Sequence, residues 1–252
     1  MQTFELGNEY IFIGKSITKG TQIKYKKDDL FLKLDGSGRE AFVEYVVSNI
    51  LNCSDLEKKD YVVYDMCQVN HKSACYSYNF LKDDEEFITM NSLYQIATGG
   101  VDLSDHLASL SGAKERLEYL CNLASAFGIS EKDFRTYLHN LVQLDLLIEN
   151  TDRHVHNYGI ILNNTTGNYR IAPIFDNARA LHTVEETYCS CTLSGSFHDQ
   201  LTAFEFPVKS SFRLDYKRVY AFLDDTLKAY GDYKEIQFLR NQLQQYQDLF
   251  CK

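Results

Sequence analysis

The sequence has 252 residues, 44% of them hydrophobic, and its 26 Lys and Arg against 35 Asp and Glu give a formal net charge of −9. The apolar content excludes a disordered chain, and the length suffices for one large core or for two lobes that share a cleft. The acidic balance argues against a dedicated nucleic-acid-binding protein, because phosphate contacts need clustered Lys and Arg.

The first third of the sequence predicts strands and one helix. Two apolar segments, residues 22–26 and 30–34, flank a charged turn and predict a β-hairpin. Residues 39–52 carry apolar side chains at three- and four-residue intervals, which is the pattern of an amphipathic helix. Further strands are predicted at residues 10–13, 60–69, 76–81 and 86–90.

From about residue 91 the pattern changes to helices. One is predicted at residues 114–127, ending at Gly128, and a second runs from the capping residue Ser130 to about residue 149. After a polar loop, the sequence predicts a hairpin at 158–163 and 168–172 and two helices at 215–230 and 233–250. We therefore expect an α+β protein with two lobes. Residues 1–90 form a small β-rich N-lobe with one helix, and residues 91–252 form a larger, mainly helical C-lobe.

The apolar segments and the cysteines indicate where in the cell the protein is expected. No apolar run approaches the ~20 residues that a membrane span needs, and the N-terminus has no basic and apolar segments typical of a secretory signal. The seven Cys are irregularly spaced, which predicts reduced thiols. The pair Cys189 and Cys191 is a weak metal signal. We expect a cytoplasmic protein with no membrane partner and no direct nucleic-acid partner.

Three oxygen-bearing side chains carry the strongest chemical signal. Asp152 and Asn157 lie five positions apart in the polar loop, and Asp176 follows the predicted hairpin. Mg²⁺ prefers carboxylate and amide oxygens, and usually takes one or two of them from the protein. Phosphoryl transfer uses one Asp to orient and deprotonate the acceptor hydroxyl, with an Asn and a second Asp on the metal. The spacing from Asp152 to Asn157 is that of a protein-kinase catalytic loop.

Phosphoryl transfer also needs a cation on the phosphates. Lys33 lies within an apolar strand, where an outward-facing lysine is the common interpretation. The helix that follows offers Glu40 and Glu44, four residues apart on one face, as ion-pair partners that would orient the lysine. Residues 14–24, with two Gly and three Lys, are a candidate flexible loop over a nucleotide, although they match neither a Walker A motif nor G-x-G-x-x-G.

These residues together resemble the HipA-like kinases, the toxin class of bacterial toxin–antitoxin pairs. The resemblance extends over most of the chain from about Ser16. It depends on four segments in the expected order: Gly20-x-Gln22-x-Lys24, residues 31–35 around Lys33, residues 150–157 with Asp152 and Asn157, and residues 171–177 with Asp176. The resemblance implies a bilobed protein-kinase-like fold, ATP and Mg²⁺, and transfer to Ser or Thr of a protein.

The resemblance also assigns roles to residues. Asp152 corresponds to the catalytic base, Asn157 and Asp176 to metal ligands, and Lys33 to the phosphate-binding lysine. Glu40 is the preferred partner of Lys33, with Glu44 as the alternative. The nucleotide-covering loop corresponds to Gly20, Gln22 and Lys24, and the candidates for autophosphorylation are Ser16 and Thr18.

The resemblance implies partners as well. The chain corresponds to a short form without the extra N-terminal subdomain of the full-length toxins. Partners implied are a protein substrate, with an aminoacyl-tRNA synthetase as one example, and a helix-turn-helix antitoxin or a small companion protein.

Other interpretations stay open. A catalytically silent kinase-fold binding or regulatory protein, or a kinase of a small molecule or lipid, would keep the same fold. His154, His156 and Asn157 could serve a metal-dependent nuclease, but the acidic balance disfavours a nucleic-acid groove. The two His have no third ligand at zinc spacing. Arg153 is expected to form a surface salt bridge.

Overall fold

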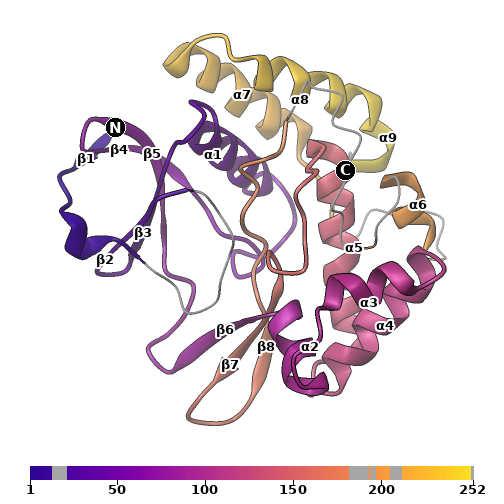
Figure 1. The fold of residues 1–252 in the computed structure, drawn as a ribbon. Helices are drawn as coiled ribbons and strands as arrows, with labels where there is room; N and C mark the ends of the chain where they lie inside the picture. The colour runs from indigo at the N-terminus through magenta and orange to yellow at the C-terminus, as the bar shows by residue number, and fades with distance from the viewer. Residues whose placement is uncertain (13–21, 182–192, 194–196, 205–211, 251–252) are drawn as a thin grey trace.

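The computed structural model describes residues 1–12, 22–181, 193, 197–204 and 212–250. One side of the molecule is a five-stranded sheet in the order β1-β4-β5-β3-β2 (Figure 1). Its strands are β1 (Gln2–Phe4), β2 (Lys24–Lys27), β3 (Leu30–Leu34), β4 (Asp65–Val69) and β5 (Lys72–Tyr78). β1 pairs with β4 in parallel, and the other pairs are antiparallel. The predicted hairpin at 22–34 is confirmed, and its register places Lys24 opposite Lys33.

Helix α1 (Glu40–Leu51) packs on β4 and β5 and confirms the predicted helix at 39–52. Its other face packs against α7 (Tyr216–Tyr230) and the following segment, where Phe42 stacks on Tyr233 with ring centroids 4.0 Å apart. Because both faces are covered, even Glu40 and Glu44 are buried. Carboxylates are almost never buried without a partner, so these two require polar contacts inside the molecule.

A second sheet, ordered β6-β7-β8, joins distant parts of the chain. It consists of β6 (Glu85–Thr89), β7 (Gly159–Asn163) and β8 (Tyr169–Ile171), all antiparallel. The close approach of β6 and β7 requires glycine at one position: a Cβ on Gly159 would overlap the backbone carbonyl of Ile88. This sheet carries the polar loop before β7 and the segment after β8 to the same region of the molecule (Figure 1).

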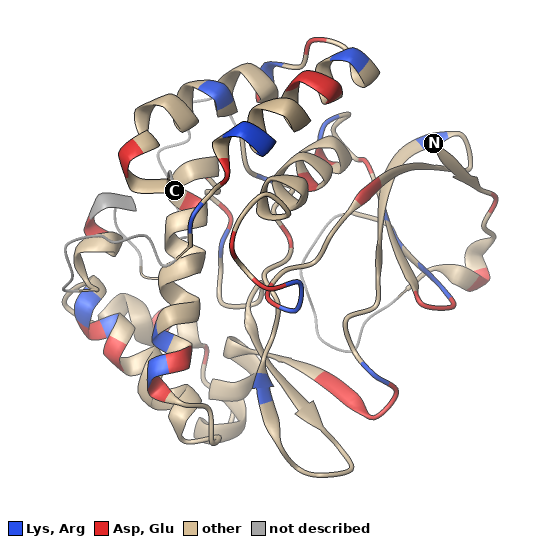
Figure 2. Cartoon of the chain, turned by 180° about the vertical axis from the view of Figure 1, so that it is seen from behind, with Lys and Arg blue, Asp and Glu red and all other residues tan. Residues whose placement is uncertain are grey.

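Helices form the other side of the molecule around α5 (Glu131–Ile148), which packs against α4, α6 and α8. The remaining helices are α2 (Met90–Thr98), α3 (Leu103–Ser109), α4 (Ala113–Ser125), α6 (Phe197–Thr202), α8 (Lys234–Gln245) and α9 (Gln247–Phe250), and a 3-10 turn spans Asn8–Tyr10. Ser130 caps α5 as predicted, accepting a hydrogen bond from the Asp133 amide. These helices carry Lys and Arg as well as Asp and Glu (Figure 2). No helix in the described ranges is long and apolar enough to cross a membrane.

The short elements differ most from the prediction. Four elements were not predicted from the sequence, namely β1, α2, α3 and α6, because three to nine residues give little periodicity. The predicted strand at 60–69 shortens to β4, and the predicted C-terminal helix breaks at Tyr246 into α8 and α9. Residues 8–10 form a 3-10 turn where a strand was expected from residue 10, and Ile11 forms an isolated bridge to Tyr25.

Candidate active site

Lys33 is the buried cation of the site. Its side chain points inward from β3 and the residue is 8% exposed, so the lysine does not face solvent. Its Nζ lies 2.6 Å from Oε1 of Glu44 on α1 and 2.9 Å from Oδ1 of Asp176. Glu44 Oε2 also accepts a hydrogen bond from the Asn177 amide at 2.9 Å. Burial alone would lower the pKa of Lys33, but the two carboxylates outweigh it and raise this pKa well above its ordinary value.

The ion-pair partner of Lys33 is therefore Glu44, and the preference for Glu40 is corrected. Glu40 accepts hydrogen bonds from Gln22 Nε2 and from the Gly36 amide, both at 2.8 Å. The reason is position along the helix. Glu40 lies in the first turn of α1 beside the loop after β3, whereas Glu44 lies one turn deeper, level with the lysine.

The polar loop after α5 presents Asp152 and Asn157. Asn157 Nδ2 donates to the Asp152 carbonyl at 2.9 Å, and the Asn157 amide donates to the His154 carbonyl at 2.8 Å. These bonds close the loop and fix the orientation of the Asn157 amide group, whose Oδ1 accepts no hydrogen bond within the described residues. The Asp152 side chain is 47% exposed, with His154 Nε2 4.0 Å from its carboxylate. Among the described residues, the Asp152 carboxylate and the Asn157 Oδ1 atom are thus available to a ligand.

Arg153 is fully buried, so the expectation of a surface salt bridge is wrong. Its Nε and Nη2 donate to Asp145 on α5 at 3.1–3.2 Å. Its Nη1 donates to the carbonyls of Phe175 at 2.6 Å and Asp176 at 3.3 Å, and its Nη2 also reaches Asn177 Oδ1. A single guanidinium thus connects α5, the loop with Asp152 and the segment with Asp176.

Asp176 has a left-handed backbone conformation, with φ of 62°. Such conformations cost free energy for a residue other than glycine and are concentrated at functional sites. Burial would raise the pKa of its carboxyl group, but the ammonium groups of Lys33 and Lys24 outweigh burial and hold this pKa well below its ordinary value. Asp176 is therefore a carboxylate at neutral pH.

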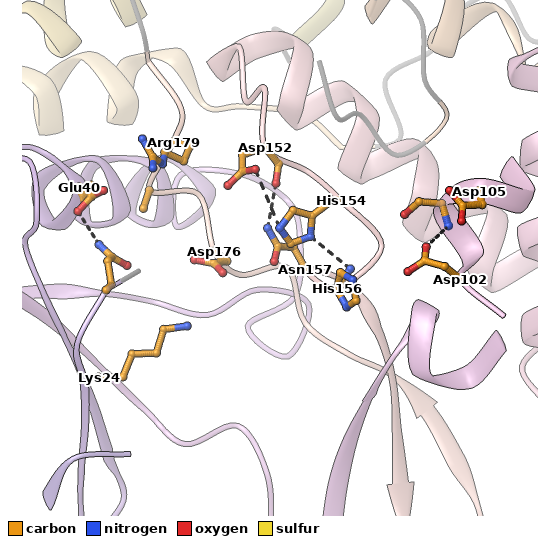
Figure 3. A pocket seen from close by; sticks show the side chains of 13 residues that line it. Lys24, Glu40, Asp102, Asp105, Asp152, His154, His156, Asn157, Asp176 and Arg179 are labelled. Atoms are coloured by element: carbon orange, nitrogen blue, oxygen red, sulfur yellow. Dashed lines mark hydrogen bonds and ion pairs between the residues drawn. The ribbon is translucent and has the colours of Figure 1, made fainter. Parts of the chain in front are cut away.

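A pocket of about 660 Å³ brings most of the predicted residues together (Figure 3). Its lining includes Gln22, Lys24, Glu40, Asp152, Asn157 and Asp176. Lys33 is not part of the lining, and its Nζ contacts Asp176 from within the protein. The predicted residues Gly20, Ser16 and Thr18, and the pair Cys189 and Cys191, lie outside the described residues.

Several lining residues were not predicted from the sequence. Asp102, Ser104 and Asp105 belong to the start of α3, an element that was not predicted, and Arg179 follows the segment with Asp176. His154 and His156 also line the pocket. In the described ranges no group of three or more His, Cys, Asp or Glu side chains could hold a metal ion. A two-ligand site that uses an amide oxygen is compatible with this result.

Known structures share this architecture. The chain resembles CtkA, a proinflammatory kinase of Helicobacter pylori, with 19% identity and a TM-score of 0.60 over 91% of this chain and 90% of that one. It also resembles HipA of Shewanella oneidensis MR-1, solved with HipB and operator DNA, with 12% identity and a TM-score of 0.48 over 94% of this chain and 59% of that one. No protein-family model and no curated protein matches the sequence. The predicted α+β, bilobed protein-kinase-like fold is confirmed by the similarity to CtkA.

Proposed function

We propose that this protein is an ATP- and Mg²⁺-dependent kinase that phosphorylates Ser or Thr residues of a protein substrate. The observation that carries the proposal is the pocket itself. Asp152, Asn157 and Asp176 line one cavity, and a lysine held by a helix glutamate contacts Asp176. This arrangement supplies an acceptor-side carboxylate, two oxygen ligands and a cation, which are the parts that phosphoryl transfer needs.

Asp176 and Asn157 fit a magnesium ion. Asp176 is ionised, and the Asn157 Oδ1 atom has no competing hydrogen-bond donor among the described residues. Mg²⁺ bound by these two oxygens would neutralise charge on the phosphates of the nucleotide. Lys33, positioned by Glu44, orients Asp176 and supplies positive charge behind it. Lys24 and Gln22 form part of the pocket wall on the side of the N-lobe, which covers the nucleotide in this proposal.

Asp152 acts as the base. The acceptor hydroxyl oxygen bonds to the terminal phosphorus, the bond from that phosphorus to the bridging oxygen breaks, and ADP leaves. The hydroxyl proton passes to the Asp152 carboxylate, which accepts no hydrogen bond within the described part of the chain. Arg153 does not touch the substrate in this scheme; it positions the loop and Asp176 relative to α5.

The proposed setting extends the resemblance to HipA-like kinases. It is cytoplasmic and involves a helix-turn-helix antitoxin or small companion protein, and the kinase is the toxin of the pair. One proposed example of its protein substrate is an aminoacyl-tRNA synthetase. Residues 1–90 and 91–252 are the proposed lobes.

Two other functions retain the same fold, a catalytically silent regulator and a kinase of a small molecule or lipid. One experiment separates them from the proposal. The purified protein is incubated with radiolabelled ATP and Mg²⁺, alone and with a cell extract, beside the Asp152→Ala variant. Label on protein Ser or Thr that falls about 10²- to 10⁴-fold in the variant supports the proposal. ATP binding without transfer to any protein contradicts it.

A further inference from the structure

Arg179 brings a guanidinium to the pocket of Asp152 and Asp176. In Figure 3 its side chain lies above the Asp176 carboxylate, and Lys24 enters from below. The Arg179 side chain is exposed, whereas the alanines on either side of it are buried. Two buried alanines thus flank an exposed arginine, and Ala178 and Arg179 both line the pocket.

The second feature of Arg179 is that its guanidinium is unpaired among the described residues. Within the described part of the chain, Arg179 forms no hydrogen bond and no ion pair. Seven other arginine side chains each form at least one, namely Arg39, Arg116, Arg135, Arg153, Arg170, Arg218 and Arg240. A guanidinium is always charged and has five N–H donors in a planar fork that matches phosphate oxygens. No described residue therefore competes with a ligand for the donors of Arg179.

The turn that carries Arg179 is held from three directions. The Ala180 amide donates to the Asn177 carbonyl at 3.0 Å, and the Leu181 amide donates to the Ile148 carbonyl at 2.7 Å. Arg39, the N-cap residue of α1, donates to the carbonyls of Ala180 and Leu181 at 2.6 and 3.2 Å. The Arg39 side chain is itself paired with Glu235 on α8 at 2.8 Å. The base of the Arg179 side chain is accordingly fixed relative to the pocket.

Charge in the pocket explains what this arginine can bind. The lining contains the carboxylates Glu40, Asp102, Asp105, Asp152 and Asp176, against the lysine or arginine cations Lys24 and Arg179. The Lys33 ammonium is occupied by Glu44 and Asp176. A nucleotide triphosphate would be repelled by these carboxylates, so its outermost phosphate needs further positive charge on the side of Asp152.

We infer that Arg179 binds the non-bridging oxygens of the terminal phosphate of the nucleotide, the group that is transferred. This inference rests on the proposed kinase function and adds to it a catalytic residue from the segment after Asp176. Arg179 distinguishes ATP from ADP, because ADP lacks the phosphate that the guanidinium contacts. Charge-assisted hydrogen bonds of this kind are roughly twice as strong as neutral ones.

The test is equilibrium binding of the β,γ-imido analogue of ATP and of ADP, each with Mg²⁺, measured by calorimetry. The variants are Arg179→Gln and Arg179→Lys, with Lys132→Gln on the exposed first turn of α5 as a control of equal charge change. We expect Arg179→Gln to weaken analogue binding roughly ten- to a hundredfold and ADP binding less than about twofold. Arg179→Lys should recover part of the lost affinity, and Lys132→Gln should leave the affinity for both ligands unchanged.

Three results would overturn the inference. Unchanged analogue binding in Arg179→Gln means that the arginine does not contact the nucleotide. Equal losses for analogue and ADP mean that it contacts some other part of the nucleotide. If the unaltered protein binds neither ligand, the proposed kinase function fails and the inference fails with it. Because Arg179 is exposed and contacts no partner within the described ranges, its substitution should leave the melting temperature within about 1–2 °C of the unaltered protein.

Discussion

Replacing Arg153 should destabilise the protein more than any surface substitution. The guanidinium is 0% exposed and is the charged partner of Asp145, which is 3% exposed. Arg153→Gln would leave a buried carboxylate without its counter-ion and remove the donor to the Phe175 carbonyl. Breaking a buried ion pair from one side costs about 3–5 kcal/mol. Partly exposed pairs such as Arg135 with Glu118 contribute only about 0.2–1 kcal/mol, so Arg135→Gln is the matched control.

Urea unfolding gives the free energies. Burial raises the pKa of Asp145 more than Arg153 lowers it, so without the arginine the folded state binds a proton more readily than the unfolded chain. Stability then rises as pH falls, and the loss in Arg153→Gln should be smaller at pH 5 than at pH 7.5. The double variant Asp145→Leu, Arg153→Met should lose less than Arg153→Gln. A loss below about 1 kcal/mol, or one that does not change with pH, would refute this reasoning.

Three further predictions concern other parts of the molecule. Gly159→Ala should cost at least about 2 kcal/mol in urea unfolding, because its Cβ meets the backbone of β6. Gly112→Ala has open space around it and should cost less than about 1 kcal/mol, the loss expected at the N-cap of α4. Equal effects would contradict the close packing of β6 and β7. Burial lowers the pKa of His139 to about 4 from an ordinary 6.5, so the unfolded state binds the extra proton as the pH falls. The free energy of unfolding should therefore fall by about 1–2 kcal/mol between pH 6.5 and 4. His139→Gln should reduce this decline, and an equal decline in the variant would mean that it has another source. Glu44→Gln should weaken binding of Mg²⁺ and the ATP analogue at least about tenfold, because it loses the ion pair to the buried Lys33. Glu40→Gln keeps that ion pair and should weaken binding less. The opposite order in calorimetry would argue against the role of Lys33.

The grouping of the candidate site residues was largely predictable from the sequence. Asp152, Asn157 and Asp176 were recognised because phosphoryl transfer constrains both the residue types and their spacing. Asn157 and both aspartates line one pocket, and Asp176 meets Lys33. The partner of Lys33 was assigned incorrectly, because Glu40 and Glu44 share a helix face. Only the depth of α1 against the sheet selects between them.

Other features required the folded chain. Arg153 is charged and lies in a polar loop, so its sequence context gave no sign of burial; its partner Asp145 lies on a helix face that looked ordinary. Arg179 follows Asp176 by three residues, yet only the folded chain shows that its exposed side chain lines the pocket between two buried alanines. The acidic start of α3 was missed with the helix itself, whose seven residues carry a cap signal at Asp102 but too few turns for periodicity.

The central claim is that Asp176 and Asn157 hold the metal of a bound nucleotide in the pocket beside Asp152. Anomalous diffraction from crystals grown with Mn²⁺ and the β,γ-imido analogue of ATP tests it most directly. The account predicts one or more manganese peaks in contact with Asp176 and Asn157 oxygens, with the terminal phosphate facing Asp152. Manganese bound elsewhere, or a nucleotide outside this pocket, would contradict it.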